Sequence, residues 1–322
     1  MQVRFVENDA KPSASLVTQA IIMSFACALR ARDPVSQLVL LLEAPAPRSH
    51  AARLSLALFA LGVTLAALGP ALWTLQFAFA SAQRIVMLAY WVGVLALGLV
   101  AMARIGALES VPQIIVRKGY HIIALLLFLP ALALEPELLA VALAVAFAGL
   151  LALEAVRVGG VPRLSKALTG FMTAFTDARD GGVLFITHLA LLVGMAAPIW
   201  VAVLSRQGTV DPSGAALAGL LILGLGDTAA SVVGRLWGRH RIARGSPKTL
   251  EGLLAGALGT LVGWAACAAL WPSTRAALLT VPPVNGGIVA ATLLSSLLES
   301  VTSQLDNAVL PPHYLAMLSC LA

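Results

Sequence analysis

The sequence has few charged residues, few aromatic residues and only three cysteines. Charged side chains make up 11% of its 322 residues, whereas a soluble domain has about a quarter. This number of charges is too small to form a polar shell around a soluble core of this size. We therefore expect lipid to be the solvent. The cysteines lack paired spacing, which argues against a disulfide framework and against a zinc site; they are Cys27, Cys267 and Cys320.

What the sequence has instead is long runs of Ala, Leu, Val and Gly, with 60% hydrophobic residues overall. A membrane-spanning helix needs about 20 apolar residues, because the hydrocarbon core is about 30 Å thick. We therefore predict an all-α fold, a polytopic transmembrane helical bundle of roughly eight to ten spans. The expected spans are 54–80, 85–103, 119–134, 138–156, 183–204, 214–234, 250–271 and 285–299, with a last apolar stretch at 308–321.

The chain is expected to form one membrane domain, residues 54–322, after a divergent N-terminal segment, residues 1–53. The apolar stretches in that segment are short and interrupted, so they indicate a broken helix, a signal anchor or an interfacial segment. No long linker, low-complexity tract or internal repeat separates further domains.

The net charge of +6 reflects membrane orientation rather than nucleic-acid binding. Twelve Lys and Arg residues lie in the loops 104–118, 157–182 and 235–249. Only three lie in the alternate loops, which are 81–84, 135–137, 205–213 and 272–284. The positive-inside rule places the first set, and with it the segment 300–307, in the cytosol.

Two polar clusters precede the middle of the chain. Arg117-Lys118-Gly119-Tyr120-His121 opens a span, either as a positive-inside anchor or as a cationic clamp for phosphate. The stretch 177–182 contains Asp180 and runs into Thr187-His188. A histidine inside a span is costly unless it is paired or solvated, so His188 is either a functional residue or a satisfied packing histidine. Trp200, at the far end of that span, is predicted to be an interfacial anchor.

The third cluster, 224–238, places Asp227 inside an apolar run. A buried carboxylate there must be compensated by a metal ion or by a cation such as Lys248. Gly224 and Gly226 allow the backbone to open beside it. Small residues that follow let a helix or a ligand approach closely; they are Ala230, Ser231 and Gly234.

The same cluster continues at 245–252, where a new span begins. Lys248, Thr249 and the free N–H groups of a helix start form an anion site, and a carboxylate nearby can hold Mg²⁺ that bridges phosphates. The residues therefore suit a magnesium-bound polyphosphate. Our hypothesis assigns the metal to Asp227 and Glu251, and the phosphates to Lys248 with Arg117 and Lys118. Lys248 follows Pro247 rather than glycine, so no Walker A motif is present.

The fourth cluster, 299–307, lies on the same predicted face and ends with Asp306-Asn307. On its own it indicates a polar turn in which Asp306 or Asn307 caps the last helix. Its position beside the other clusters favours a functional role. The candidate bases for a lipid hydroxyl are Asp180, His188 and Asp306, which the sequence does not rank.

In this order, the clusters resemble the motifs of the dolichol kinase family over about residues 117–315. The matching elements are Arg-Lys-x-x-His, Asp-x-Arg-Asp-x-Gly, Gly-Asp-Thr-x-Ala-Ser-x-x-Gly, Lys-Thr-x-Glu-Gly and Thr-x-Gln-x-Asp-Asn before Leu310-Pro311. The resemblance implies CTP as phosphate donor, a divalent cation such as Mg²⁺, and the polyisoprenoid alcohol dolichol as acceptor in the endoplasmic reticulum membrane. Dolichyl phosphate made there would feed protein glycosylation, and the sequence indicates no protein partner.

The resemblance also implies site residues. Those expected to act in catalysis are Asp227, Lys248, Glu251, Asp180, His188 and Asp306. Those expected to bind the nucleotide are Arg117, Lys118, Gly226, Thr228, Ser231, Gly234, Thr249 and Gly252.

Three other functions are associated with clusters of this kind. A related lipid-alcohol kinase, acting on phytol, another polyprenol or diacylglycerol, shares the third motif. A membrane transporter also carries charges and glycine-broken helices, but near the bilayer midplane and often in inverted repeats. The Gly-x-Gly-Asp match of an intramembrane aspartyl protease is set aside, because the spans before Asp227 contain no second aspartate.

Overall fold

The computed structural model describes residues 68–108, 111–158, 164–173, 185–205, 214–242, 247–270, 284–301 and 306–321. Within these ranges the regular structure is helical, apart from one isolated bridge between Arg241 and Thr249. The predicted all-α class is therefore confirmed. The segment 1–53 and the stretch 177–182, with Asp180, lie outside the described residues.

The helices agree closely with the predicted spans. They are α4 (Ala82–Gly106), α5 (Gln113–Leu134), α6 (Pro136–Val158), α7 (Leu164–Thr173), α8 (Thr187–Ser205), η2 (Ala215–Leu217), η3 (Leu220–Asp227), α9 (Thr228–Leu236), α10 (Leu250–Leu270), α11 (Gly286–Val301) and α12 (Asp306–Leu321). In the described part of the chain, 6 segments are long and apolar enough to cross a membrane, and Gly286–Val301 is a shorter apolar helix. The chain is therefore a multi-pass membrane protein.

Side-chain caps fix where several of these helices begin. The Ser81 hydroxyl accepts from the backbone N–H of Arg84 at 3.2 Å, before α4. Thr249 Oγ1 accepts from Gly252 at 3.2 Å before α10, and Asn285 Oδ1 accepts from Ile288 at 2.9 Å before α11. Such caps satisfy N–H groups that the first helical turn leaves without partners. The sequence-based boundaries fall within a few residues of these starts.

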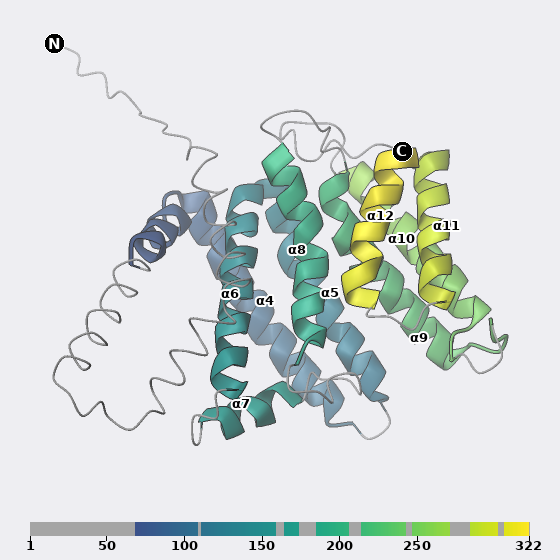
Figure 1. Cartoon of the computed structure of the whole chain (residues 1–322), viewed down its shortest axis with the longest axis horizontal. Coiled ribbons are helices and arrows are strands. Elements are labelled where there is room, and N and C mark those ends of the chain that lie inside the picture. Colours follow the sequence, from purple (N-terminus) through teal and green to yellow (C-terminus); the bar gives the residue numbers. More distant parts are fainter. Residues whose placement is uncertain are drawn as a thin grey trace, which may run out of the picture.

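In the view of Figure 1, the lower ends of the helices are the starts of α5, α8, α10 and α12 and the ends of α6, α9 and α11, with the lower ends of α11 and α12 higher than those of α5 and α6. We call this end of the bundle the pocket face. The short helix α7 lies along it beneath α6, within a segment predicted only as a loop. The polar clusters of the sequence, so far as they are described, therefore lie at one end of the bundle.

The segment Ala215–Leu236, which contains η2, η3 and α9, forms the centre of the bundle. From Leu220 to Leu223 its side chains are at most 1% exposed, and it packs against α5, α8, α10 and α12. Gly214 starts this segment at a φ of 79°, in the left-handed region that glycine adopts without steric cost. From Leu220 to Asp227 the helix is a π-helix, a wider turn that occurs often at functional sites.

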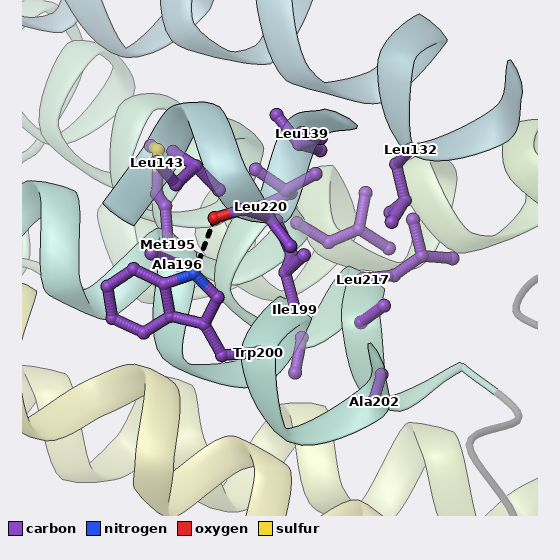
Figure 2. Close-up of a cluster of buried hydrophobic side chains, with 14 of the residues drawn as sticks. Leu132, Leu139, Leu143, Met195, Ala196, Ile199, Trp200, Ala202, Leu217 and Leu220 are labelled. Carbon is purple, nitrogen blue, oxygen red and sulfur yellow. Dashed lines mark hydrogen bonds between the residues drawn. The ribbon is translucent and has the colours of Figure 1, made fainter. Parts of the chain in front are cut away.

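Beside this segment lies an apolar cluster that includes Trp200 (Figure 2). The indole of Trp200 is 4% exposed, and its N–H donates to the carbonyl of Ala140 at 3.0 Å. The prediction of an interfacial anchor is therefore wrong. Interior packing satisfies the indole N–H through a backbone carbonyl of α6, so Trp200 needs no contact with the membrane surface.

The segment from Gly226 through α9 packs closely on α10 through small residues. A Cβ added to Gly256 would come within 3.0 Å of the Ala230 Cβ and 3.2 Å of the Gly226 carbonyl. A Cβ added to Gly252 would come within 2.8 Å of the Ala230 carbonyl. Glycines therefore allow the two backbones to approach, as small residues do in other membrane helix pairs.

Candidate functional site

A cavity of about 430 Å³ opens at the pocket face, between helix ends that are far apart in the sequence. Its walls come from the start of α5, from Asp227 and α9, from the start of α10, and from the α11–α12 junction. Thr187 contributes the start of α8. The charged residues that line it are Arg117, Lys118, Asp227, Arg235, Arg241, Lys248, Glu299 and Asp306.

Asp227 is the most buried carboxylate of the site, with 4% of its surface exposed. It forms an ion pair with Lys118, and Ser231 Oγ donates to it at 3.3 Å. His121 Nδ1 lies 3.6 Å from its Oδ2 and donates to the Leu223 carbonyl at 3.2 Å. A buried carboxylate is tolerated only with such partners. The cation beside Asp227 therefore comes from the first polar cluster, more than one hundred residues earlier in the chain.

Lys248 lies on the opposite side of the site and is held by two carboxylates. Its Nζ is 3.3 Å from Asp306 Oδ2 and 3.5 Å from Glu299 Oε1. Burial lowers the pKa of Lys248, but Glu299, Asp306 and Asp227 raise it more, so its pKa lies above the ordinary 10.5. Its positive charge is therefore present throughout the neutral range and is lost only at strongly alkaline pH.

Two described segments, 239–242 and 247–250, pair in antiparallel fashion and carry Arg241 and Lys248 to the cavity wall; we call these two segments the hairpin. The Ile242 N–H donates to the Lys248 carbonyl at 3.2 Å, and the Leu250 N–H donates to the His240 carbonyl at 2.9 Å. Glu251 accepts from the backbone N–H of His240 at 3.2 Å, and its Oε1 lies 2.6 Å from the His240 ring. Glu251 is therefore a contact of the hairpin and is not among the residues that line the cavity.

The structure brings most of the predicted site residues together. Those that line the cavity are Arg117, Lys118, Asp227, Ser231, Gly234, Lys248, Thr249, Gly252 and Asp306. Gly226 lies instead in the helix contact with α10, where an added Cβ would collide with Thr260. Thr228 and Glu251 are also outside the lining. Of the predicted metal pair, Asp227 therefore lines the cavity and Glu251 does not.

His188 is likewise outside the cavity lining and interacts electrostatically with Glu154 of α6. Glu154 is 4% exposed and accepts two bonds from Arg157, at 2.8 and 2.5 Å. It also accepts from the Phe185 N–H at 2.6 Å, and Arg157 stacks over the Phe185 ring at 3.8 Å. This buried cluster fixes the start of α8 on α6, and with it Thr187 on the cavity wall.

Glu299 is the main site residue that sequence reasoning missed. It is 6% exposed at the end of the apolar helix α11 and contacts Lys248. A carboxylate at the end of a predicted span was a usable signal, but of the cluster 299–307 only Asp306 was predicted to act in the site. Arg235 and Arg241 were counted as loop charges, although both line the cavity.

The lining combines five Lys or Arg side chains with three carboxylates. Cations converging on a cavity suit the phosphates of a nucleotide, and carboxylates suit hard divalent cations. Among the described residues, no three metal-binding side chains cluster closely enough to hold an ion by themselves. The three lining carboxylates nevertheless suit Mg²⁺, because this ion takes one or two protein carboxylates and completes its shell with substrate phosphates and water.

Comparisons with known proteins agree on one family. The family model described as dolichol kinase matches residues 37–271. The chain is 36% identical over 250 residues to dolichol kinase EVAN of Arabidopsis thaliana, covering 77% of this chain and 43% of that protein. It is 33% identical over 260 residues to the human dolichol kinase, covering 77% and 47%. It is 28% identical over 253 residues to the dolichol kinase of Saccharomyces cerevisiae, covering 75% and 43%.

The chain thus spans about half the length of the curated relatives it matches. The family-model match begins at residue 37, ahead of the motifs at 117–315, and ends at residue 271. No solved structure matches the chain.

Proposed function

The chain belongs to the dolichol kinase family, and we propose that it transfers the γ-phosphate of CTP to the hydroxyl of dolichol. The observation that carries the proposal is the cavity at the pocket face, where cations from separate clusters surround buried carboxylates at the ends of membrane helices. Phosphoryl transfer depends on positioning and charge neutralisation more than on covalent chemistry by the protein. A cavity with this lining supplies both.

In this proposal the phosphates of CTP lie against the cations of the cavity. Arg235 and Arg241 approach from α9 and the hairpin, Lys248 from the start of α10, and Arg117 from α5. Arginine forks bind phosphate oxygens in pairs, and lysine adds a mobile point charge. Gly234 and Gly252 also line the cavity, where the absence of side chains lets α9 and the start of α10 approach each other closely.

The residues that would hold Mg²⁺ are Asp227 and Glu299, whose carboxylates both line the cavity. When bound, the ion would neutralise charge on the phosphate oxygens. Lys118 neutralises the same Asp227 carboxylate in the structure. Glu299 thus takes the place that the sequence hypothesis gave to Glu251.

Asp306 is our candidate for the group that accepts the proton of the lipid hydroxyl. It is the one predicted base that lies on the described cavity wall, and its carboxylate is 3.3 Å from Lys248. A carboxylate on the cavity wall is a group of the kind that accepts such a proton in general base catalysis. Of the other two candidates, His188 lies beside Glu154, and Asp180 is outside the described residues.

The lipid acceptor suits a cavity placed at helix ends. Side chains on the outer faces of the spans, such as Val92, Leu97 and Leu258, are more than half exposed and would contact lipid. A long isoprenoid tail can remain among these lipids while its hydroxyl reaches the cavity. We place the reaction at the cytosolic face of the endoplasmic reticulum membrane, where its product would feed protein glycosylation.

The test is a kinase assay on purified protein in detergent and lipid, with γ-labelled CTP or ATP and Mg²⁺. Dolichol, phytol and diacylglycerol are offered in parallel. We expect label to move from CTP to dolichol, and the Asp227→Asn variant to lose about a thousandfold in rate. The Arg84→Met variant, which alters an ion pair that lies outside the cavity lining, serves as the control.

Each other outcome has a defined meaning. Transfer from CTP to phytol or diacylglycerol alone would replace dolichol by a related lipid alcohol and keep the cavity assignments. Transfer from ATP alone would overturn the donor. No transfer from either nucleotide, with folded wild-type and variant proteins behaving alike, would overturn the kinase proposal and favour a transporter.

A further inference from the structure

Glu251 belongs to the Lys-Thr-x-Glu-Gly motif, yet it lies outside the cavity lining. Its side chain is 26% exposed and forms hydrogen bonds with His240, eleven residues earlier. Both carboxylate oxygens accept from the His240 backbone N–H at 3.2 Å, and Oε1 lies 2.6 Å from the imidazole Nδ1. The Glu251 carboxylate thus contacts both the backbone N–H and the imidazole ring of His240.

That residue sits at the base of the hairpin. The His240 carbonyl accepts from the Leu250 N–H at 2.9 Å, next to the bridge between Arg241 and Thr249. The imidazole itself is 77% exposed, so His240 has little packing to hold it in place. Two contacts therefore hold His240 against the start of α10. One is the backbone bond from Leu250, and the other is the Glu251 side chain.

The neighbours of these contacts are residues of the cavity. Arg241 follows His240 directly, and Lys248 pairs with Ile242 across the hairpin. Long basic side chains lose much rotational freedom when they are fixed on a phosphate, so a rigid backbone beneath them lowers the cost of binding. Movement of the hairpin would displace both cations together.

We propose that Glu251 is a positioning residue, which acts through His240 to hold Arg241 and Lys248 against the phosphates of the nucleotide. The effect of Glu251 on catalysis rests on the proposed function. Its contact with His240, which we call the clamp, does not. A role as metal ligand makes a different prediction, because it would affect the requirement for Mg²⁺ rather than the order of the hairpin.

The test compares Glu251→Ala, Glu251→Gln, His240→Ala and the Glu251→Ala/His240→Ala double variant. Hydrogen exchange is measured at the backbone amides of His240, Ile242 and Leu250. Kinetics are measured as KM for CTP, KM for dolichol and the Mg²⁺ concentration that gives half-maximal rate. Glu137→Gln is the matched control, since it removes a first-turn carboxylate from α6 and lies outside the cavity lining.

We expect faster exchange at the three amides in both alanine variants, and about a tenfold rise in the KM for CTP. The KM for dolichol and the Mg²⁺ requirement should change by less than about twofold, because neither group contacts the hairpin in this proposal. Glu251→Ala should have the larger effect, because His240→Ala keeps the backbone N–H that donates to Glu251, and the double variant should match Glu251→Ala. Glutamine, which keeps an acceptor oxygen, should rescue part of the effect.

Unchanged amide exchange in Glu251→Ala would overturn the clamp whatever the activity. A raised Mg²⁺ requirement in Glu251→Ala that is absent from His240→Ala would overturn the positioning role and support a metal ligand. Wild-type protein that transfers no phosphate would instead overturn the proposed function, and the exchange measurement would still decide whether the clamp exists.

Discussion

Helix α4 and the central segment Ala215–Leu236 are both candidate membrane spans, but their surroundings are opposite. The most apolar window of α4 has a mean hydropathy of 2.4, and 6% of it is buried in the protein. The central segment has a lower mean hydropathy of 1.8, and 61% of it is buried. The more hydrophobic helix is therefore the one that the protein covers less.

This difference in burial arises because lipid, not water, surrounds the spans. Lipid accepts apolar side chains as readily as the protein interior does, so hydrophobicity gives a span no reason to be buried. Small residues that permit close backbone approach, and polar groups that need partners, do give such a reason. The central segment has both, with Gly219, Gly226 and Asp227, whereas Val92 and Leu97 of α4 are 68% and 76% exposed.

The largest effect should come from the polar partner of the central segment. Lys118→Met leaves Asp227 buried without its nearest cation, and we expect a loss of about 3–5 kcal/mol in the free energy of unfolding. Thermal and denaturant unfolding in detergent would measure it. Kinase activity should fall below detection, because the substitution also removes a cation from the cavity wall.

A second substitution separates stability from activity. Lys118→Met with Asp227→Asn removes both charges, so stability should largely return while activity does not. Arg84→Met provides the comparison at α4, because Arg84 and Glu135 form a similarly covered pair, with 14% and 15% of their side chains exposed. Arg84→Met should lower stability and leave the kinetics of the remaining folded protein unchanged. Recovery of activity in the double variant would contradict the role of the pair in the site.

The next effect concerns glycine in the same two spans. A Cβ added to Gly219 would come within 2.9 Å of the Met195 Cα and 3.2 Å of its carbonyl, in the backbone of α8. A Cβ added to Gly93 of α4 would meet nothing within 4 Å. We expect Gly219→Ala to destabilise the protein by about 1–3 kcal/mol through overpacking. We expect Gly93→Ala to stabilise it by up to about 1 kcal/mol through helix propensity.

Unfolding of the two variants in one detergent would check these signs. If both alanines stabilised the protein equally, the close approach of α8 to the central segment would be contradicted. If both destabilised it, α4 would have a packing partner at Gly93 that the described residues do not show.

The smallest effect should come from the lipid-facing side of α4. Leu97→Ala should change the free energy of unfolding by less than about 0.5 kcal/mol, since the lost contacts are with lipid or detergent. Leu221→Ala, at a side chain that is fully buried in the central segment, should cost about 2–5 kcal/mol. A large cost for Leu97→Ala would show that this face of α4 is covered in the native protein.

Much of the fold was readable from the sequence, because each span records its own hydrophobic length. The predicted 250–271 corresponds to α10 and the predicted 285–299 to α11, within two residues at each boundary. Local chemistry also marked Asp227 and Lys248 as site residues. It failed for Trp200, whose amphipathic ring is equally suited to a membrane interface and to an interior with a free carbonyl.

The site was less predictable, because its contacts join distant segments. Asp227 was expected to need a cation, and Lys248 was named, but the direct ion pair is with Lys118. Glu251 was assigned a metal and contacts His240 instead, while Glu299 occupies the cavity wall. Spacing along the chain cannot distinguish these carboxylates, since each lies near the end of a predicted span.

The sequence by itself determined the helical class, the approximate limits of the described spans, and the gathering of polar clusters on one face. These follow from hydrocarbon thickness, the need to satisfy backbone hydrogen bonds in lipid, and the alternation of basic loops. Tertiary structure alone decided which span is central and which carboxylate meets which cation. Those choices depend on close approach between segments that are distant in the sequence, such as those of Lys118 and Asp227 or of Lys248 and Glu299, where small side chains and buried charges select the partner.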